Sequence, residues 1–115
     1  MLTLAWAKLN DGWYQFDLVN INYVVSGVYV IWHAGNPARS VKVGQGDINS
    51  RLSTHRNDPA ITAYRQSGRL YITWAAVPAH QIDGVERYLA DYYKPLVGDR
   101  YPDVAPIPVN LPGAA

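Results

Sequence analysis

The sequence has no cysteine and no long apolar run. Without cysteine, neither a disulfide framework nor a thiolate metal site can form, and this absence fits a reducing compartment. No stretch approaches the roughly 18 apolar residues of a membrane span, and the first residues lack the basic start and apolar centre of a secretion signal. We therefore expect a cytoplasmic protein that does not enter a membrane.

The chain does have enough apolar residues to fold. Hydrophobic residues make up 49% of the 115 positions and charged residues 17%, with four tryptophans and nine tyrosines. This composition excludes global disorder, and the length fits one domain. We expect a single domain over residues 1–115, with its core at about 26–94 and a proline-rich, irregular tail at 95–115.

Charge is scarce overall and unevenly spread. A net charge of +1 argues against a protein that coats nucleic acid by charge alone. Residues 39–69, however, hold six basic residues and two acidic ones, a local charge of +4, while both flanks are net negative. A local basic patch attracts phosphate even when the whole protein is nearly neutral. A solvated charged helix face is the other interpretation.

Turn signals and short apolar patterns divide the chain into strands and helices. Asn10-Asp11-Gly12 predicts a β-hairpin turn. Asp47 is a suitable N-cap for a helix, and Pro59 suits the first turn of a second, short helix. We expect strands at 27–32, 40–44 and 70–77, with the first two antiparallel, and helices at 48–56, from 58 to about 67, and at 83–93.

Two triplets within this pattern resemble the signature of the GIY-YIG nuclease family. They are Gly-Val-Tyr at 27–29 and Lys-Val-Gly at 42–44, and the segment VGQGDINSRLSTHR continues the second triplet as it does in the family. The resemblance implies an α/β fold of the α+β sandwich type, with a central three-stranded antiparallel sheet flanked by helices. It also implies hydrolysis of DNA phosphodiester bonds that leaves a 5′-phosphate, with one divalent metal, Mg²⁺ or Mn²⁺.

Lys42 departs from the family, which usually has a tyrosine there, although some restriction enzymes of the family resemble this chain in having lysine. Tyr29 is our candidate for the general base. A phenol has a pKa of about 10, so a nearby cation such as Lys42 would help it to ionise. The other interpretations are a core or rim tyrosine at 29 and, at 42, a solvent-facing lysine between core-facing valines.

The strand register tests whether Tyr29 and Lys42 belong to one site. In an antiparallel pair, the numbers of directly opposed residues have a constant sum, and side chains alternate between faces. Tyr29 and Lys42 share a face only if that sum is odd. A symmetric turn centred on Asn36 would separate them.

Arg51 and His55 lie one helical turn apart after the second triplet. The planar donors of an arginine engage two phosphate oxygens at once, so Arg51 is a candidate for the phosphate. His55 points the same way along the helix and is a candidate for hydrogen bonding to the phosphate or to the attacking water. Both residues also suit an ordinary helix surface.

The metal candidate is Glu86, because one carboxylate with waters and substrate oxygens commonly holds Mg²⁺. Asp83-Gly84-Val85-Glu86 also has the spacing of a capping box, in which Glu86 would reach back to the helix N-cap. The family completes its site with an asparagine near the C-terminal end, where Asn110 is the candidate.

We expect a metal-dependent DNA endonuclease with the catalytic residues named above. The alternative is a catalytically degenerate domain that binds nucleic acid or a protein. With so few basic residues, tight DNA binding would call for a protein partner or a homodimer.

Overall fold

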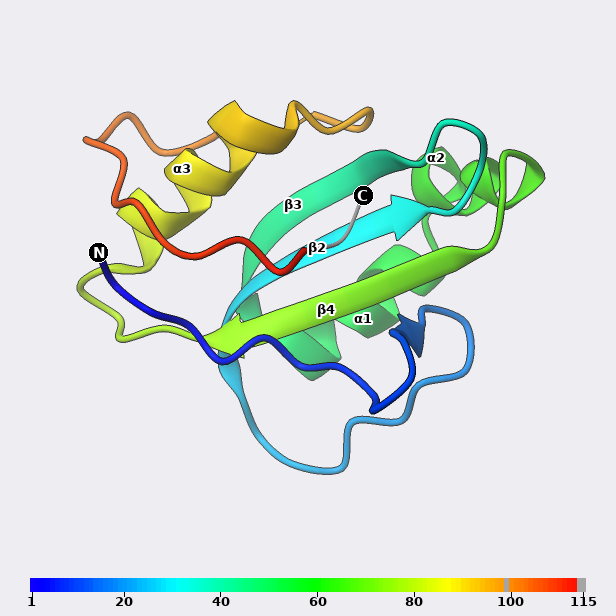
Figure 1. Ribbon diagram of the computed structural model, residues 1–115, viewed down its shortest axis with the longest axis horizontal. Helices are drawn as coiled ribbons and strands as arrows, with labels where there is room; N and C mark the ends of the chain where they lie inside the picture. The colour runs from blue at the N-terminus through cyan, green and yellow to red at the C-terminus, as the bar shows by residue number, and fades with distance from the viewer. Residues whose placement is uncertain (99, 114–115) are drawn as a thin grey trace.

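Four antiparallel strands form one sheet in the order β1-β4-β2-β3 (Figure 1). The strands are β1 (Tyr14–Gln15), β2 (Ser26–His33), β3 (Arg39–Asp47) and β4 (Leu70–Ala76). This architecture is that of a computed structural model, which describes residues 1–98 and 100–113. The prediction of three strands was wrong by one. β1 pairs only Tyr14 with Ile72 and Gln15 with Tyr71, so it is too short to show an alternating pattern in the sequence.

The helices are α1 (Ile48–Arg56), α2 (Pro59–Thr62), a 3₁₀ turn η1 (Ala63–Gln66) and α3 (Ile82–Tyr93). Their positions follow the predicted ones closely because local signals set them. The Asp47 carboxylate accepts the Ser50 amide at 2.9 Å, as expected of an N-cap. Asp58 caps α2 in the same way through the amide of Ala60. The predicted hairpin near residue 11 is only a turn with an isolated bridge between Leu9 and Gly12.

The sheet has two buried faces with different neighbours. Alternate residues of β2, such as Val28 and Val30, pack in a cluster with Val85 and Leu89 of α3. Residues between them, such as Tyr29, pack in a second cluster. That cluster includes Ile48 and Leu52 of α1, and Figure 1 shows α1 behind the sheet and both terminal segments in front of it. Because both faces are covered, β2 is buried everywhere except at Ser26.

A β-bulge in β3 settles the register of the central hairpin. Near the turn, His33 opposes Arg39 and Trp32 opposes Ser40, but past a shift of one residue Ile31 opposes Lys42 and Tyr29 opposes Gly44. The sum of paired numbers is therefore odd at the site, and Tyr29 and Lys42 lie on the same face as diagonal neighbours. This confirms the register that a shared site requires. The bulge also explains how Val41 packs with the α1 cluster and Val43 with the α3 cluster.

The C-terminal segment runs along the molecule without regular structure, as its prolines predicted. After α3, the amides of Leu96 and Val97 donate to the carbonyls of Ser40 and Val41 at 3.0 and 2.8 Å. These bonds cover part of the outer edge of β3, which would otherwise expose unpaired backbone groups. Further on, Val109 is buried and bridges to Leu2. Among the described residues, no helix is long and apolar enough to span a membrane.

Candidate active site on the edge strand

The centre of the candidate site is a hydrogen bond between Tyr29 of β2 and His55 of α1. The Tyr29 hydroxyl lies 2.6 Å from His55 Nε2, and the ring centroids are 5.4 Å apart. Both side chains are deeply buried, with exposed fractions of 1% and 4%. This is a hydrogen bond between a phenol oxygen and an imidazole nitrogen, whose donor depends on the histidine tautomer, and two such groups are able to exchange a proton.

Gly44 makes room for this pair. A Cβ atom built on Gly44 would lie 2.1 Å from the Tyr29 hydroxyl oxygen and 2.4 Å from the ring carbon that carries it. Neither contact is possible, so the phenol lies directly over the glycine. Gly44, the last residue of the second triplet, therefore has to be a glycine, because Tyr29, the last residue of the first triplet, occupies the space that a side chain would need.

Lys42 comes to the same face two residues before Gly44. Its side chain is 4% exposed, so the interpretation of Lys42 as a solvent-facing strand lysine was wrong. The physical reason is the bulge, which directs Val41 and Lys42 to the α1 side. A buried lysine is costly to desolvate, which makes Lys42 a candidate for a functional group.

Arg51 lies further along the same face, beside Gly46. The Cγ and Cδ atoms of Arg51 are 3.5 Å from the position that a Cβ of Gly46 would occupy, which is ordinary contact. Gly46 has a φ of +127°, a conformation that favours glycine. Arg51 is partly exposed.

Glu86 approaches from the α3 side of the same strand. It is 7% exposed, and its Oε1 accepts a hydrogen bond of 2.9 Å from the Gln45 side-chain amide. The same amide donates to Asp83 Oδ1 at 2.7 Å. Gln45 opposes Val28 and thus points to the α3 face, whereas its neighbour Gly44 opposes Tyr29. Glu86 and Tyr29 thus approach successive residues of β3, Gln45 and Gly44, from opposite faces of the sheet.

The capping-box interpretation of Glu86 was wrong. α3 begins at Ile82 with Gln81 as its N-cap, so Asp83 is the second helical residue rather than the cap. The reason is that Ile82 packs against the α3 cluster and extends the helix toward the N-terminus. Glu86 therefore contacts β3 through Gln45 instead of serving a helix end.

The donor set fits Mg²⁺ only as a single-carboxylate site. Among residues 1–98 and 100–113, no three His, Asp or Glu side chains gather in a group that could hold a metal ion. Mg²⁺ retains several waters and is commonly bound by one or two carboxylates with substrate phosphates. The hard oxygens of Glu86, oriented by Gln45, match that preference.

Asn110 makes hydrogen bonds with the N-terminal segment. Its side-chain oxygen accepts the Leu4 amide at 2.6 Å, and its side-chain nitrogen donates to the Leu4 carbonyl at 2.9 Å. Asn110 thus joins the two terminal segments on the α3 face. Both side-chain hydrogen bonds that the structure shows for Asn110 are with Leu4, and a part for Asn110 in the catalytic site stays a prediction.

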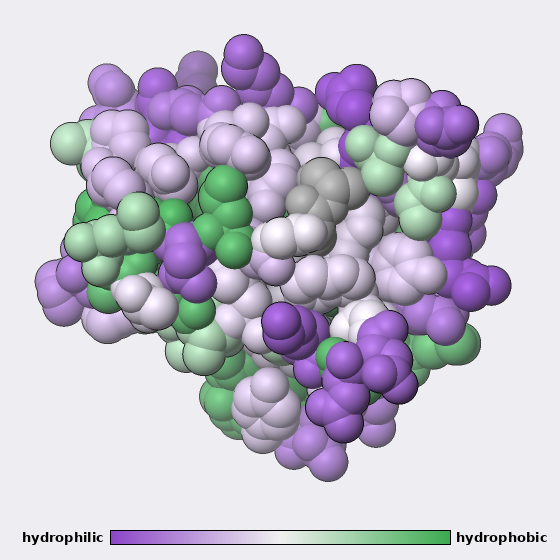
Figure 2. All heavy atoms as spheres, viewed as in Figure 1, coloured by the Kyte–Doolittle hydropathy of each residue, from purple (hydrophilic) through white to green (hydrophobic). Residues whose placement is uncertain are grey.

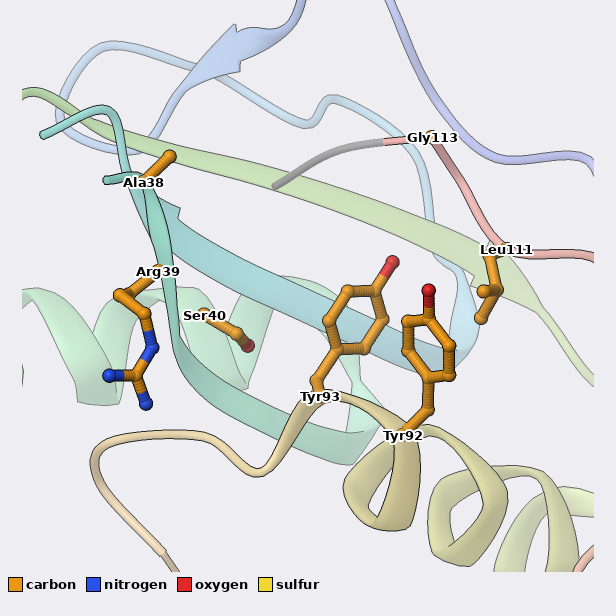
Figure 3. Close-up of a pocket in the computed structure, with 7 residues that line it drawn as sticks. All are labelled: Ala38, Arg39, Ser40, Tyr92, Tyr93, Leu111 and Gly113. Carbon is orange, nitrogen blue, oxygen red and sulfur yellow. The ribbon is translucent and has the colours of Figure 1, made fainter. Parts of the chain in front are cut away.

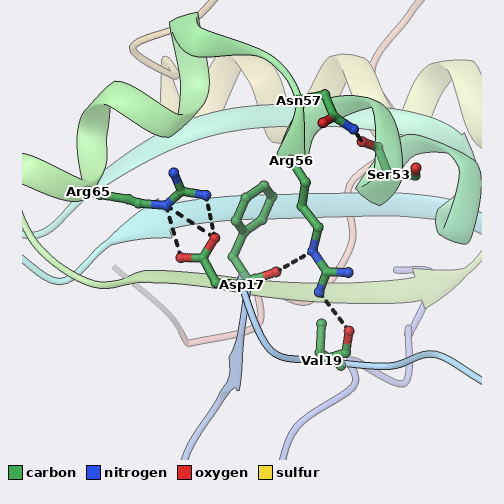
Figure 4. A network of polar contacts seen from close by, with 7 residues as sticks. Asp17, Val19, Ser53, Arg56, Asn57 and Arg65 are labelled. Carbon is green, nitrogen blue, oxygen red and sulfur yellow. Dashed lines mark hydrogen bonds and ion pairs between the residues drawn. The ribbon is translucent and has the colours of Figure 1, made fainter.

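The basic segment 39–69 does not form one patch. Arg56 donates to the carbonyls of Phe16 and Val19 at 2.8 and 2.6 Å, and Arg65 binds the Asp17 carboxylate through two nitrogens (Figure 4). The hydrogen bonds to Asp17 raise the pKa of Arg65 above its ordinary value. With Lys42 buried as well, half of the six basic side chains serve the fold or the protein interior, so the patch prediction was too broad.

Sequence reasoning missed Gln45 and Asp83 as partners around the carboxylate. The glutamine stands inside the motif segment, directly after Gly44, yet only the sheet pairing shows which face it takes. Comparisons of the chain with family models, curated proteins and solved structures found no match. Function must be inferred from the residues of this chain.

Proposed function

We propose that the protein is a metal-dependent endonuclease that hydrolyses DNA phosphodiester bonds, as its resemblance to GIY-YIG nucleases implies. The observation that carries the proposal is the 2.6 Å bond between Tyr29 and His55 on the face that also holds Lys42. These residues come from β2, α1 and β3. Their convergence is what proton abstraction from a water molecule requires.

In this mechanism Tyr29 is the general base, and His55 receives the phenol proton. Ordinary pKa values of a phenol and an imidazole differ by about 3.5, so an unassisted transfer costs about 5 kcal/mol. A cation on the same face lowers that cost by favouring the phenolate, which is the role of Lys42. The resulting phenolate then accepts a proton from the attacking water.

The phosphate is engaged by Arg51, and Glu86 holds the metal. Arg51 is a partly exposed cation one helical turn before His55 on α1, and its fork of donors matches two phosphate oxygens. When bound, Mg²⁺ polarises a phosphoryl oxygen and offsets the charge that builds on it. Gln45 fixes the orientation of the Glu86 carboxylate.

A second function is favoured by one specific observation. Tyr29 and His55 are almost fully buried, so the same hydrogen bond also suits a polar pair within the core of a binding domain. A catalytically degenerate module that binds nucleic acid or a protein is therefore the alternative.

Nicking of supercoiled plasmid, with Mg²⁺ and with a chelator, separates the two functions. We expect nicking that needs Mg²⁺ and that falls at least about 100-fold in Tyr29→Phe, because general-base catalysis contributes roughly 10²–10⁴-fold. Glu86→Gln, which keeps the shape and the contact with Gln45, should also be inactive. Tyr71→Phe is the matched control, because Tyr71 stacks on Trp32 in the other cluster.

The expected result for the control is the activity of the parent protein. If the parent does not nick any DNA form with Mg²⁺ or Mn²⁺, the binding module is the correct function. If Tyr29→Phe nicks at the parent rate, the nuclease survives but its base is another group, with His55 the first to examine by His55→Ala.

A further inference from the structure

A cleft of about 370 Å³ lies between the start of β3 and the C-terminal end of α3 (Figure 3). Its lining combines the base of the strand, two tyrosines of the helix and the C-terminal segment: Ala38, Arg39, Ser40, Tyr92, Tyr93, Leu111 and Gly113. The volume falls in the range of small-molecule sites. None of these residues belongs to the candidate active site.

A buried hydroxyl in this cleft indicates a ligand. Ser40 is 3% exposed, and its Oγ has no hydrogen-bond partner among the described residues. Figure 3 shows this hydroxyl directed toward the tyrosine side of the cleft. Buried polar atoms are nearly always paired, so an unpaired one that lines a cleft is suited to a polar ligand atom.

Two tyrosine rings give the cleft a stacking surface. Tyr92 and Tyr93 lie edge to face with centroids 5.0 Å apart, and Tyr92 is 59% exposed. A large, solvent-exposed aromatic ring beside a cleft is suited to stack on a flat ligand. Burial, with a smaller contribution from Tyr92, raises the pKa of Tyr93 to about 12, so its hydroxyl stays neutral and able to donate.

Arg39 supplies charge at the other end. It is exposed, and in Figure 3 its guanidinium points away from the two tyrosine hydroxyls. The cleft thus offers an aromatic surface and hydroxyl groups at one end and a cation at the other. A nucleotide has this same division into a flat base and an anionic phosphate.

We propose that the cleft binds one unstacked nucleotide of a DNA strand, with the base on Tyr92 and the phosphate on Arg39. The inference rests on the proposed function, because it makes that DNA strand the substrate. Ser40 and Gly44 are four residues apart on β3, or about 13 Å at about 3.3 Å per residue. Ser40 opposes Trp32 on the α3 face and Gly44 opposes Tyr29 on the α1 face, so a strand that reaches both must pass around the outer edge of β3. The preferred substrate then has an unpaired base to one side of the cut.

Fluorescence of 2-aminopurine tests this inference without metal and without cleavage. The probe is a single-stranded oligonucleotide with one 2-aminopurine, compared with the same strand carrying an abasic site. We expect quenching on binding and about tenfold weaker binding of the abasic strand, because stacking on an aromatic ring is worth about 1–3 kcal/mol per base. Tyr92→Ala should remove both effects, and Tyr92→Phe should keep them.

Two further variants make the test specific. Leu18→Ala, which truncates an exposed apolar side chain outside the cleft, should bind like the parent. Arg39→Gln should weaken binding of normal and abasic strands alike and reduce its salt dependence, because it removes a phosphate contact. The inference is overturned if the abasic strand binds as well as the normal one, or if Tyr92→Ala leaves the difference unchanged.

The source of the nucleotide is tested with free dAMP. If dAMP binds as tightly as the oligonucleotide, the cleft belongs to a free nucleotide and the DNA inference fails. If the protein binds the strand in a base-dependent way but nicks no plasmid, the nucleotide site in the cleft is supported and the proposed nuclease activity is overturned. If the protein nicks plasmid but its strand binding does not depend on the base, the nucleotide site in the cleft is overturned and the proposed nuclease activity stands.

Discussion

The two faces of the sheet are equally buried but are filled with different chemistry. The α3 face holds an apolar cluster that includes Val28, Trp32 and Leu89, with the carboxylate of Glu86 as its buried charged group. The α1 face places a tyrosine, a lysine and a histidine among its apolar side chains. Buried polar groups cost free energy unless they are paired, and an apolar side chain of similar size would fill the same space without that cost. The α1 face therefore carries most of the buried polar groups that the proposed function uses, while the α3 face contributes apolar packing together with Glu86.

Truncating the apolar cluster of the α3 face should produce the largest loss of stability. Leu89 is fully buried, so Leu89→Ala should lower the free energy of unfolding by about 2–5 kcal/mol through lost burial and a residual cavity. Urea denaturation followed by circular dichroism measures this effect. Nicking by the folded fraction at low temperature should match that of the parent. A specific activity lowered 100-fold in folded Leu89→Ala would contradict the division between the faces.

Gly44→Ala should disturb the contact between Tyr29 and His55 on the α1 face by adding a single methyl group. The added carbon would overlap the Tyr29 hydroxyl, so the ring must move and its bond to His55 must lengthen or break. We expect a loss of about 1–3 kcal/mol in unfolding free energy, as for other overpacked sites, and a loss of nicking beyond what the unfolded fraction explains.

Gly12→Ala is the matched control for this substitution. A Cβ at Gly12 meets no atom within 4 Å, so the change in stability should be close to zero and nicking unchanged. A Gly44→Ala protein that is as stable and as active as the Gly12→Ala protein would show that the close approach of Tyr29 to Gly44 has no consequence.

Sequence patterns located most of the elements because their signals are local. The helix at 48–56 was predicted with its observed bounds, since Asp47 caps it and Ile48 and Leu52 form its apolar stripe. The strand register, in contrast, could not be predicted from local signals. The numbers of paired residues have an even sum near the turn, and only the bulge at Val41 makes this sum odd at Tyr29. Nothing in the sequence Val-Lys-Val distinguishes a bulge from simple alternation.

The candidate site was predictable only in its residue types. Tyr29 and His55 lie 26 positions apart, and their contact depends on how α1 packs on the sheet. The role of Asn110 depends likewise on contact with Leu4, at the opposite end of the chain. Gln45 was missed because a glutamine in a strand has no distinguishing pattern, and its role follows from Glu86 arriving on the same face.

Alkaline pH should lower the free energy of unfolding through the ionisation of Tyr93 on α3. Its pKa is about 12 in the folded protein, against about 10 in an unfolded chain. Between these values the unfolded state has released a proton that the folded state retains, so stability falls as pH rises from about 10 to 12. Tyr93 is partly exposed, and solvent screening reduces the effect to about 1 kcal/mol. Chemical denaturation of the parent and of Tyr93→Phe should show a shallower decline with pH in the variant, and equal declines would contradict this assignment.

The smallest effect is expected where α3 ends. Lys94 has a φ of 47° and a ψ of 62°, the left-handed conformation that costs an L-residue roughly 1–2 kcal/mol and glycine almost nothing. Glycine also gains freedom in the unfolded chain, which offsets about 0.4–1 kcal/mol of that advantage. Lys94→Gly should therefore be about 0.5–1 kcal/mol more stable than Lys94→Ala, which loses the same side chain but keeps the strained Cβ. Urea midpoints of the two variants provide the measurement, and a less stable glycine variant would show that the left-handed residue is not strained. Because Lys94 is exposed and outside both clusters, neither substitution should alter nicking.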